Sequence, residues 1–194
     1  GIRVDKGTTA TDATGTPTAI NNGTINLDGD SSIGMVGTNA DVVNKTGKTI
    51  GTTTGKTIVN GIGMATTGGD LQNDGTITLN GTGVSTNVGV YMTKGTSNPT
   101  GILGSASKIN VKGDNSTGVL ITNGTLDYGG DTTVTGAGVS GVIVGDNGAN
   151  AANVTTTSAG KITVNDGSGG SAGVYEYTDG LGKKIKKGSY GIVV

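Results

Sequence analysis

A two-strand pattern repeats along the whole chain, and this repetition constrains the fold more than any other feature. Its clearest copy runs over residues 108–121, where a strand, a polar turn and a second strand follow one another. Ile109 and Val111 alternate with polar residues, which is the period of two of a half-buried strand. Gly113 and Asn115 belong to a turn, because Gly permits a positive φ and Asn hydrogen-bonds to nearby backbone. A recurring unit of this kind predicts a stacked fold.

Each copy has an apolar anchor in its first strand and a glycine that opens its second strand. The anchors are Ile2, Ile25, Ile58, Ile77, Ile109, Leu126, Ile162 and Ile185, and the glycines are Gly34, Gly63, Gly89, Gly118, Gly141, Gly173 and Gly191. By subtraction, successive anchors lie 17 to 36 residues apart and successive glycines 18 to 32. Such intervals are typical of the coils of a β-solenoid, in which each repeat packs on its neighbours. We therefore predict an all-β fold, a parallel β-helix of about seven to eight coils, with residues 1–194 as one domain.

The composition favours strands around a thin core. Forty of the 194 residues are Gly, aromatic residues make up 3%, and Trp, Phe, His and Cys are absent. Gly disfavours a helix by about 1 kcal/mol relative to Ala, whereas β-branched residues favour strands. We expect the inward-facing residues to stack into ladders of like side chains along the axis. The expected inward pairs are Ile25 with Leu27, Ile77 with Leu79, Ile109 with Val111, Leu126 with Tyr128, and Ile162 with Val164.

An antiparallel β-sandwich is the rival fold. The dipeptides Asn22-Gly23, Asn80-Gly81 and Asn123-Gly124 are suitable hairpin turns for it. A sandwich, however, does not require the same two-strand pattern to recur seven times. The repetition therefore favours the solenoid.

The path of the coils leaves one question open. Only 17 residues separate Ile109 from Leu126, which is short for a coil of three strands. Either long and short coils alternate, or some turns of the solenoid contain two copies of the pattern. Candidates for a third strand in the longer intervals are Val42-Val43, Ile102-Leu103, Val134 and Val154.

The second strands are apolar on both faces. One face contains Met35, Val90, Met92, Val119, Ile121, Val142, Val144 and Val174, and the other contains Val36, Ala65, Tyr91, Leu120, Ile143, Tyr175 and Val193. If the first set lines the core, the second forms an exposed apolar stripe unless a loop covers it. Exposed apolar patches mark interaction sites. From this stripe we select Tyr91, Leu120, Ile143 and Tyr175 as candidate binding residues.

The chain has little material for catalysis or metal binding. It has no His or Cys, one Arg (Arg3) and one Glu (Glu176), so we predict no catalytic residues, no cofactor and no enzyme activity. Asp residues occur at turn positions, but the Gly and distal Glu of a calcium loop are missing after Asp28, so we expect turn residues and no metal site. The turn carboxylates are Asp28, Asp30, Asp114, Asp146 and Asp166. A net charge of −1 argues against a nucleic-acid partner.

The repeated pattern resembles the passenger repeats of large Gram-negative autotransporter adhesins. It reads Thr/Lys-Ile-x-Val/Leu-x-Gly-Asp, followed by Gly-Val-x-Val/Met, and the likeness covers essentially the whole chain. The giant passengers of fusobacterial outer-membrane adhesins are the most similar group. The resemblance implies a right-handed parallel β-helix that is exported by type V secretion. It also implies display outside the cell, anchorage through a C-terminal β-barrel outside this chain, and roles in cell adhesion and virulence.

We therefore expect a cell-surface adhesin passenger segment, located outside the cell at the outer membrane. Such a rod would display a binding surface for a host cell-surface protein or glycan, or for other bacteria. A β-helical polysaccharide lyase or glycosidase and a pure spacer without a ligand are the alternatives. We also expect the segment to be truncated at both ends from a longer passenger. It would then be monomeric or stack end to end through its exposed edge strands.

Overall fold

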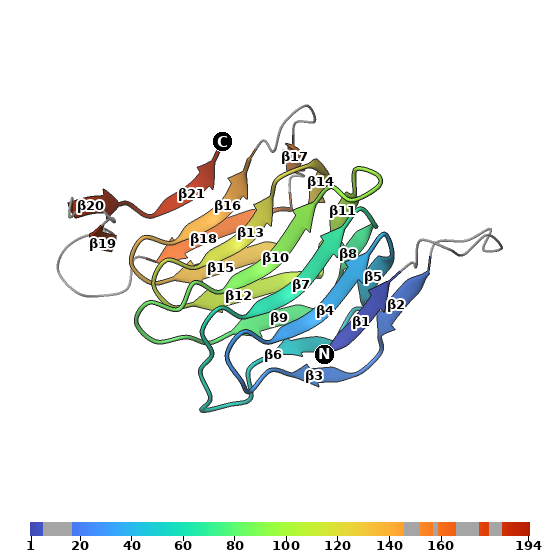
Figure 1. Ribbon diagram of the computed structural model, residues 1–194, viewed down its shortest axis with the longest axis horizontal. Coiled ribbons are helices and arrows are strands. Elements are labelled where there is room, and N and C mark those ends of the chain that lie inside the picture. The colour runs from blue at the N-terminus through green and yellow to red at the C-terminus, as the bar shows by residue number, and fades with distance from the viewer. Residues whose placement is uncertain (6–16, 146–151, 157–158, 166–174, 179–183) are drawn as a thin grey trace.

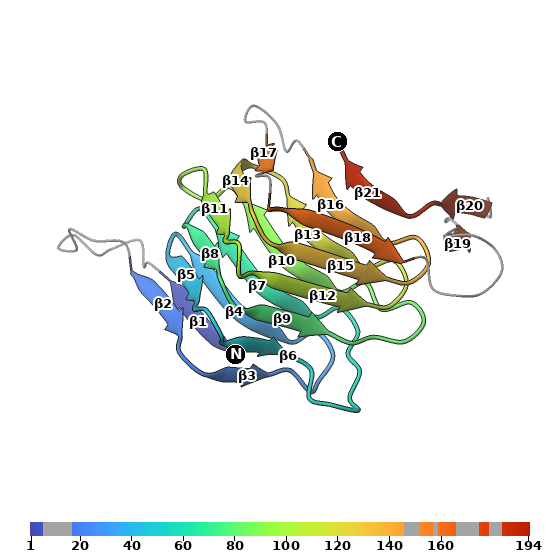
Figure 2. The same ribbon diagram turned by 180° about the vertical axis from the view of Figure 1, so that it is seen from behind.

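The chain winds into a right-handed parallel β-helix (Figures 1 and 2). The computed structural model describes residues 1–5, 17–145, 152–156, 159–165, 175–178 and 184–194, and this part contains strands and turns but no helix. Each coil contributes one strand to each of three sheets, which we name A, B and C in chain order. The predicted β-solenoid is therefore confirmed.

The described strands distribute evenly among the three sheets. Sheet A contains β1 (Ile2–Asp5), β4 (Ile33–Thr38), β7 (Ile62–Thr67), β10 (Val88–Thr93), β13 (Thr117–Ile121), β16 (Ser140–Val144) and β21 (Tyr190–Val193). Sheet B contains β2 (Thr18–Asn21), β5 (Asp41–Asn44), β8 (Leu71–Asn73), β11 (Thr100–Leu103), β14 (Gly124–Tyr128) and β17 (Ala152–Thr156). Sheet C contains β3 (Thr24–Asn26), β6 (Thr49–Gly51), β9 (Thr76–Leu79), β12 (Lys108–Lys112), β15 (Asp131–Thr135) and β18 (Lys161–Asn165). A separate antiparallel pair joins β19 (Tyr175–Thr178) to β20 (Lys184–Lys187).

The antiparallel sandwich is excluded by the pairing of the strands. Neighbouring strands within sheets A, B and C run parallel, for example β9 with β12 and β10 with β13. The Asn-Gly dipeptides therefore do not form hairpins. Asn22-Gly23 lies at the corner between β2 and β3, Asn123-Gly124 at the start of β14, and Asn80-Gly81 directly after β9.

The predicted first strands are only partly correct, because they mix three different sheets. Ile25, Ile77, Ile109 and Ile162 do lie in sheet C. The other anchors lie elsewhere: Ile2 in β1 of sheet A, Leu126 in β14 of sheet B, Ile58 in the buried part of the loop after β6, and Ile185 in β20. The pattern was misassigned because an inward Ile or Leu between polar residues looks the same on every side of the solenoid.

The true coil length removes the problem of the 17-residue interval. In sheet C the residues in register are Ile25, Ile50, Ile77, Ile109, Thr132 and Ile162, so successive coils differ by 25, 27, 32, 23 and 30 residues. The 17 residues from Ile109 to Leu126 lead from sheet C of one coil to sheet B of the next. Thr132 hid this sheet C strand, because a polar residue takes the position of the expected Ile.

The core is thin and built from ladders, as predicted. The inward pairs of sheet C are buried or packed against the core, and Leu126 and Tyr128 are also buried, although they belong to sheet B. Of the candidate third strands, Val42, Ile102 and Val154 lie in sheet B, whereas Val134 lies in β15 of sheet C. Each coil therefore contributes a few apolar side chains to a continuous column.

A column of glycines in sheet A faces the β-branched ladder of sheet C. In the sheet A strands from β4 to β21, the residues before and after the glycine pair with the corresponding residues of the next strand. This register aligns Gly34, Gly63, Gly89, Gly118, Gly141 and Gly191. A Cβ on Gly89 would lie 2.5 Å from the Cγ2 methyl of Ile109 and 2.5 Å from the carbonyl oxygen of Gly118. The predicted glycine repeat therefore marks the positions where sheets A and C approach most closely. Gly173 lies outside the described residues, and β21 continues the sheet next to β16.

A buried ladder of amides lines the corner between sheets B and C. Asn21 Nδ2 donates to Asn44 Oδ1 at 2.8 Å, Asn44 Nδ2 donates to Asn73 Oδ1 at 2.7 Å, and Asn73 Nδ2 donates to Ser107 Oγ at 2.6 Å. All four residues are buried. Each amide therefore satisfies the next one along the axis and ties neighbouring coils together, because an unpaired buried amide is costly.

Substituting the central glycine of the column tests its role. We expect Gly89→Ala to destabilise the fold by about 3 kcal/mol, because its methyl meets backbone and a buried side chain at once. Gly23→Ala is the matched control, since a Cβ there meets nothing within 4 Å, and it should change stability by less than about 0.5 kcal/mol. Urea denaturation of both variants measures the difference. Equal midpoints would contradict the packing argument.

Removing one member of the amide ladder tests how much the ladder contributes to stability. Asn44→Ala leaves the Nδ2 of Asn21 and the Oδ1 of Asn73 buried without their partner, and we expect a loss of about 2–5 kcal/mol. Asn22→Ala removes an exposed amide at the same corner and should be neutral within about 0.5 kcal/mol. Thermal unfolding followed by circular dichroism compares the two.

Candidate functional site

The predicted apolar stripe is a single column on the outer face of sheet A. The register pairs Val36 with Ala65, Ala65 with Tyr91, Tyr91 with Leu120, Leu120 with Ile143, and Ile143 with Val193. We call this set, Val36, Ala65, Tyr91, Leu120, Ile143 and Val193, the outer column. The structure thus brings three of the four selected residues, from coils far apart in sequence, onto adjacent strands.

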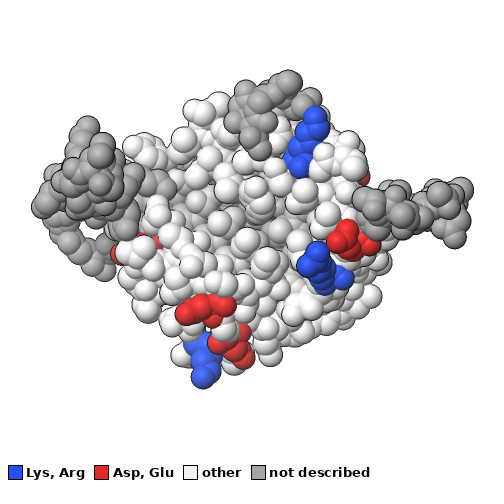
Figure 3. All heavy atoms as spheres, in the orientation of Figure 1, with Lys and Arg blue, Asp and Glu red and all other residues white. Residues whose placement is uncertain are grey.

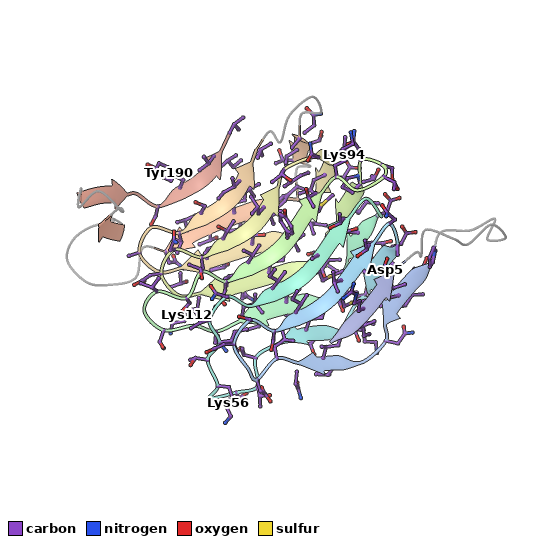
Figure 4. The ribbon with its side chains drawn as sticks, in the orientation of Figure 1. Asp5, Lys56, Lys94, Lys112 and Tyr190 are labelled. Carbon is purple, nitrogen blue, oxygen red and sulfur yellow. The ribbon has the colours of Figure 1, made fainter. Side chains whose placement is uncertain are left out.

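The outer column lies on the solvent side of sheet A because the other side of the same strands faces the core; within the column, Ala65 is buried. Met35, Val90, Met92, Val119 and Ile121 are fully buried, as expected for the inward set. Tyr91, Leu120 and Ile143 are half-buried by their neighbours in the sheet. No described segment lies over the middle of sheet A, where the sticks of the strands are directly visible (Figure 4). The alternative of a loop-covered stripe is therefore not what the described chain shows.

Tyr175 does not belong to the outer column. Its backbone lies in β19 and pairs with Lys187 of β20, while the position next to Ile143 is taken by Val193. The side chain of Tyr175, like residue Val174, lies outside what the structure describes. The likeness of Gly173-Val174-Tyr175 to a second strand misled the prediction, because β20 and β19 pair with each other and not with sheet A.

Two flanking columns widen the face, and the sequence analysis did not select them. Ile33, Ile62 and Val88 align on one side of the outer column, and Thr38, Thr67 and Thr93 align on the other. Ile33 is 38% exposed, and Ile62 and Val88 are half-buried. The sequence spacing could have identified both flanking columns. The apolar column lies three positions before Val36, Ala65 and Tyr91, and the threonine column lies two positions after them.

The face of sheet A carries no charged side chain across its middle. Figure 3 shows Lys, Arg, Asp and Glu only toward the periphery of this view. Arg3 and Asp5 of the edge strand β1 form an exposed ion pair at 3.3 Å. Lys56, Lys94 and Lys112 lie near the corners of the coils rather than over the sheet (Figure 4). The result is an uncharged apolar band with a threonine border.

The turn carboxylates bind the backbone of the next coil. Asp28 accepts from the Thr53 amide at 3.2 Å, Asp30 from the Val59 amide at 2.8 Å, and Asp114 from the Ala137 amide at 2.8 Å. Hydrogen bonds from Thr53 also hold the pKa of Asp28 below its usual value. These contacts match the predicted turn role. Asp146 and Asp166 lie outside the described residues.

Two further carboxylates act in the same way at the edge of sheet B. Asp41 accepts from the Asp70 amide at 2.9 Å, and Asp70 accepts from the Thr100 amide at 2.8 Å. Within the described residues, no group of three Asp or Glu side chains gathers closely enough to hold a metal ion. The carboxylates thus link successive coils one at a time.

Among the described residues, Tyr128 is a titratable group in a buried environment. Its side chain is fully buried, and its hydroxyl donates to the carbonyl oxygen of Lys161 at 3.1 Å. Burial raises the pKa of Tyr128 from 10.0 to about 12. The hydroxyl faces the core and the next coil, so this perturbed pKa belongs to a structural group.

Comparison with protein-family models, with curated proteins and with solved structures gave no match for this chain. The described residues also contain no helix that would be long and apolar enough to cross a membrane.

The pKa of Tyr128 predicts how stability changes at alkaline pH. In the unfolded chain the hydroxyl ionises near pH 10, whereas the folded state keeps its proton until about pH 12. The unfolded state therefore binds fewer protons between these values, and the free energy of unfolding should fall as the pH rises through this window. Tyr128→Phe removes this contribution, so its urea midpoint should fall less steeply. Parallel slopes for both proteins would contradict the assignment.

Proposed function

We propose that this chain is a segment of a cell-surface adhesin passenger, a rod that displays a binding face for host cells or other bacteria. The observation that carries the proposal is the outer face of sheet A, where an apolar column continues over neighbouring strands without an intervening charge. Apolar patches of a few hundred Å² are the largest that a typical monomer exposes, and they are often functional.

The dimensions of the face suit a modest, repeated contact. Strands in a sheet lie about 4.8 Å apart, so the outer column from Val36 to Val193 runs for about 24 Å. The strands are about 20 Å long, so the face covers roughly 500 Å². This area is less than one side of a standard protein–protein interface. A single segment would then bind weakly, and several such faces along a rod would gain avidity.

The chemistry of the face favours a protein partner. Tyr91, Leu120 and Ile143 offer apolar area together with one aromatic hydroxyl, and the threonines at the border supply hydrogen-bonding groups. Aromatic and aliphatic side chains surrounded by a polar rim are the usual composition of protein interfaces. The likeness of the repeats to autotransporter passengers supports the same proposal, including type V secretion and a position outside the outer membrane.

The two alternatives predict different behaviour. A glycosidase requires a pair of carboxylates that is free to act on substrate, whereas Asp28, Asp30 and Asp114 each hold a backbone amide of the next coil. A pure spacer would have no saturable partner. Depolymerisation of candidate glycans and binding to cells separate these alternatives from an adhesin.

A triple substitution on the outer column tests the proposal. The variant Tyr91→Ser, Leu120→Ser and Ile143→Ser removes apolar area from three adjacent strands. Asn110→Ser, Thr133→Ser and Thr163→Ser is the matched control, because these residues lie outward in the same three coils on sheet C. Saturable binding of the labelled chain to epithelial cells and to bacteria is measured for all three proteins.

We expect the outer-column variant to bind about tenfold or more weakly, and the control to bind like the unmodified chain. Circular dichroism and thermal unfolding check that both variants remain folded. Binding that survives in the outer-column variant would move the contact to another face. An absence of saturable binding in the unmodified chain would favour the spacer.

A further inference from the structure

A hollow of about 340 Å³, lined mostly by uncharged Thr, Asn and Gly residues, lies on the outer face of sheet C, away from the outer column of sheet A. It spans the first three coils, where β3, β6 and β9 lie side by side and the loop after β6 leaves the sheet (Figure 2). Ligand pockets in proteins begin at about 300 Å³, so the hollow has room for a small molecule. Its lining consists of Thr24, Asn26, Thr49, Ile50, Gly51, Thr52, Thr54, Gly55, Thr78 and Asn80.

The hollow exists because a glycine interrupts an outward column. Asn26, Gly51 and Thr78 are in register on the three strands, so the central position has no side chain. A Cβ on Gly51 would collide with the carbonyl oxygen of Thr78, and therefore no other residue fits there without a shift of the backbone. The gap is thus a permanent feature of the sheet surface.

The wall of the hollow is held in place by hydrogen bonds. The Thr52 amide donates to the carbonyl oxygen of Thr78 at 2.9 Å, and the Asn80 amide donates to Thr52 Oγ1 at 3.0 Å. The Thr53 amide donates to Asp28 in the preceding coil at 3.2 Å. The loop after β6 is therefore tied to both neighbouring coils, and the hollow is preformed.

Several polar side chains around the hollow have no hydrogen-bond partner in the described protein. The Thr49 hydroxyl donates to Thr24 Oγ1 at 3.2 Å, and Thr52 Oγ1 accepts a hydrogen bond from the Asn80 amide. The side chains of Asn26, Thr54, Thr78 and Asn80 make no hydrogen bond to the described residues. Two amides and two hydroxyls, each with a donor and an acceptor, are thus among the groups that line the hollow.

The lining has no charged residue, which selects the class of ligand. A phosphate, carboxylate or amine would lose its hydration there without gaining an opposite charge. A molecule with many hydroxyl groups, in contrast, matches alternating donors and acceptors. We propose that this hollow binds a neutral pyranose sugar, either as a free monosaccharide or as the terminal residue of a glycan. The site is separate from the sheet A face and does not depend on the function proposed for that face.

Removing two of the unpaired groups tests the sugar site. In the variant Thr78→Val with Asn80→Ala, the methyl shape of the threonine is kept while a hydroxyl and an amide are lost. The matched control is Thr133→Val with Asn110→Ala, since both residues follow Thr78 in the same outward column but lie outside the hollow. The probes are the methyl glycosides of glucose, galactose and N-acetylglucosamine, with methyl glucuronide as the charged comparison.

Amide shifts in nitrogen-15 NMR spectra locate the binding and measure its strength. We expect a neutral glycoside to bind with a Kd in the millimolar range and to shift the amides of Gly51, Thr52 and Thr78. The double variant should bind it about tenfold more weakly, while the control keeps the affinity of the unmodified chain. A longer oligosaccharide with the same terminal sugar should bind at least as well if the natural source is a glycan chain, and more weakly if it is a free monosaccharide.

Other outcomes would overturn the proposal. They are the absence of saturable shifts with all three neutral probes, equal affinity for the charged glucuronide, or undiminished affinity in the folded double variant. The outer-column variant of sheet A should keep its affinity for the sugar. A failure at one face is therefore distinguishable from a failure at the other.

Discussion

The close approach of sheet A to sheet C is the constraint on which the rest of the structure depends. From Gly34 to Gly141, a β-branched methyl of sheet C occupies the space where a Cβ of sheet A would otherwise lie, as Ile77 does at Gly63 and Ile109 at Gly89. This contact keeps the core only a few side chains thick, which is why a chain almost without aromatic residues can fill it. It also repeats from one coil to the next, so a glycine and a β-branched Ile or Thr recur along the axis.

Stacking in register has a second consequence, which is that every outward position becomes a column. The same geometry that aligns the core residues aligns Tyr91, Leu120 and Ile143 on sheet A. It aligns Asn26, Gly51 and Thr78 on sheet C. One face thereby becomes an uncharged apolar band and another a polar surface with a hollow. Two chemically different surfaces arise from one repeated unit, and each is rigid because amides and carboxylates link successive coils.

The sequence analysis was most reliable where a residue has only one physical explanation. The repeated glycine is the second residue of β4, β7, β10, β13, β16 and β21, and in the first five of these strands a Cβ would collide with a methyl of sheet C. The analysis was weaker where several explanations exist. Ile58 and Leu126 have the same local pattern as Ile109, yet one lies in a loop and the other in sheet B. Thr132 occupies a buried position where the pattern predicts an apolar residue. Nothing in the sequence around Asn44 predicts that its side chain is buried in an amide ladder.

The sequence by itself determined that the chain is a parallel solenoid, because the period of its repeats and the placement of glycine and β-branched residues allow little else. It also indicated that the strands which begin with the repeated glycine are apolar on both faces. Only the tertiary structure decided which outward residues share a column, since the loops between strands vary in length and local spacing does not record the register. For this reason Val193, and not Tyr175, follows Ile143. For the same reason the hollow beside Gly51, formed by three coils and a loop, emerged only when the coils were stacked.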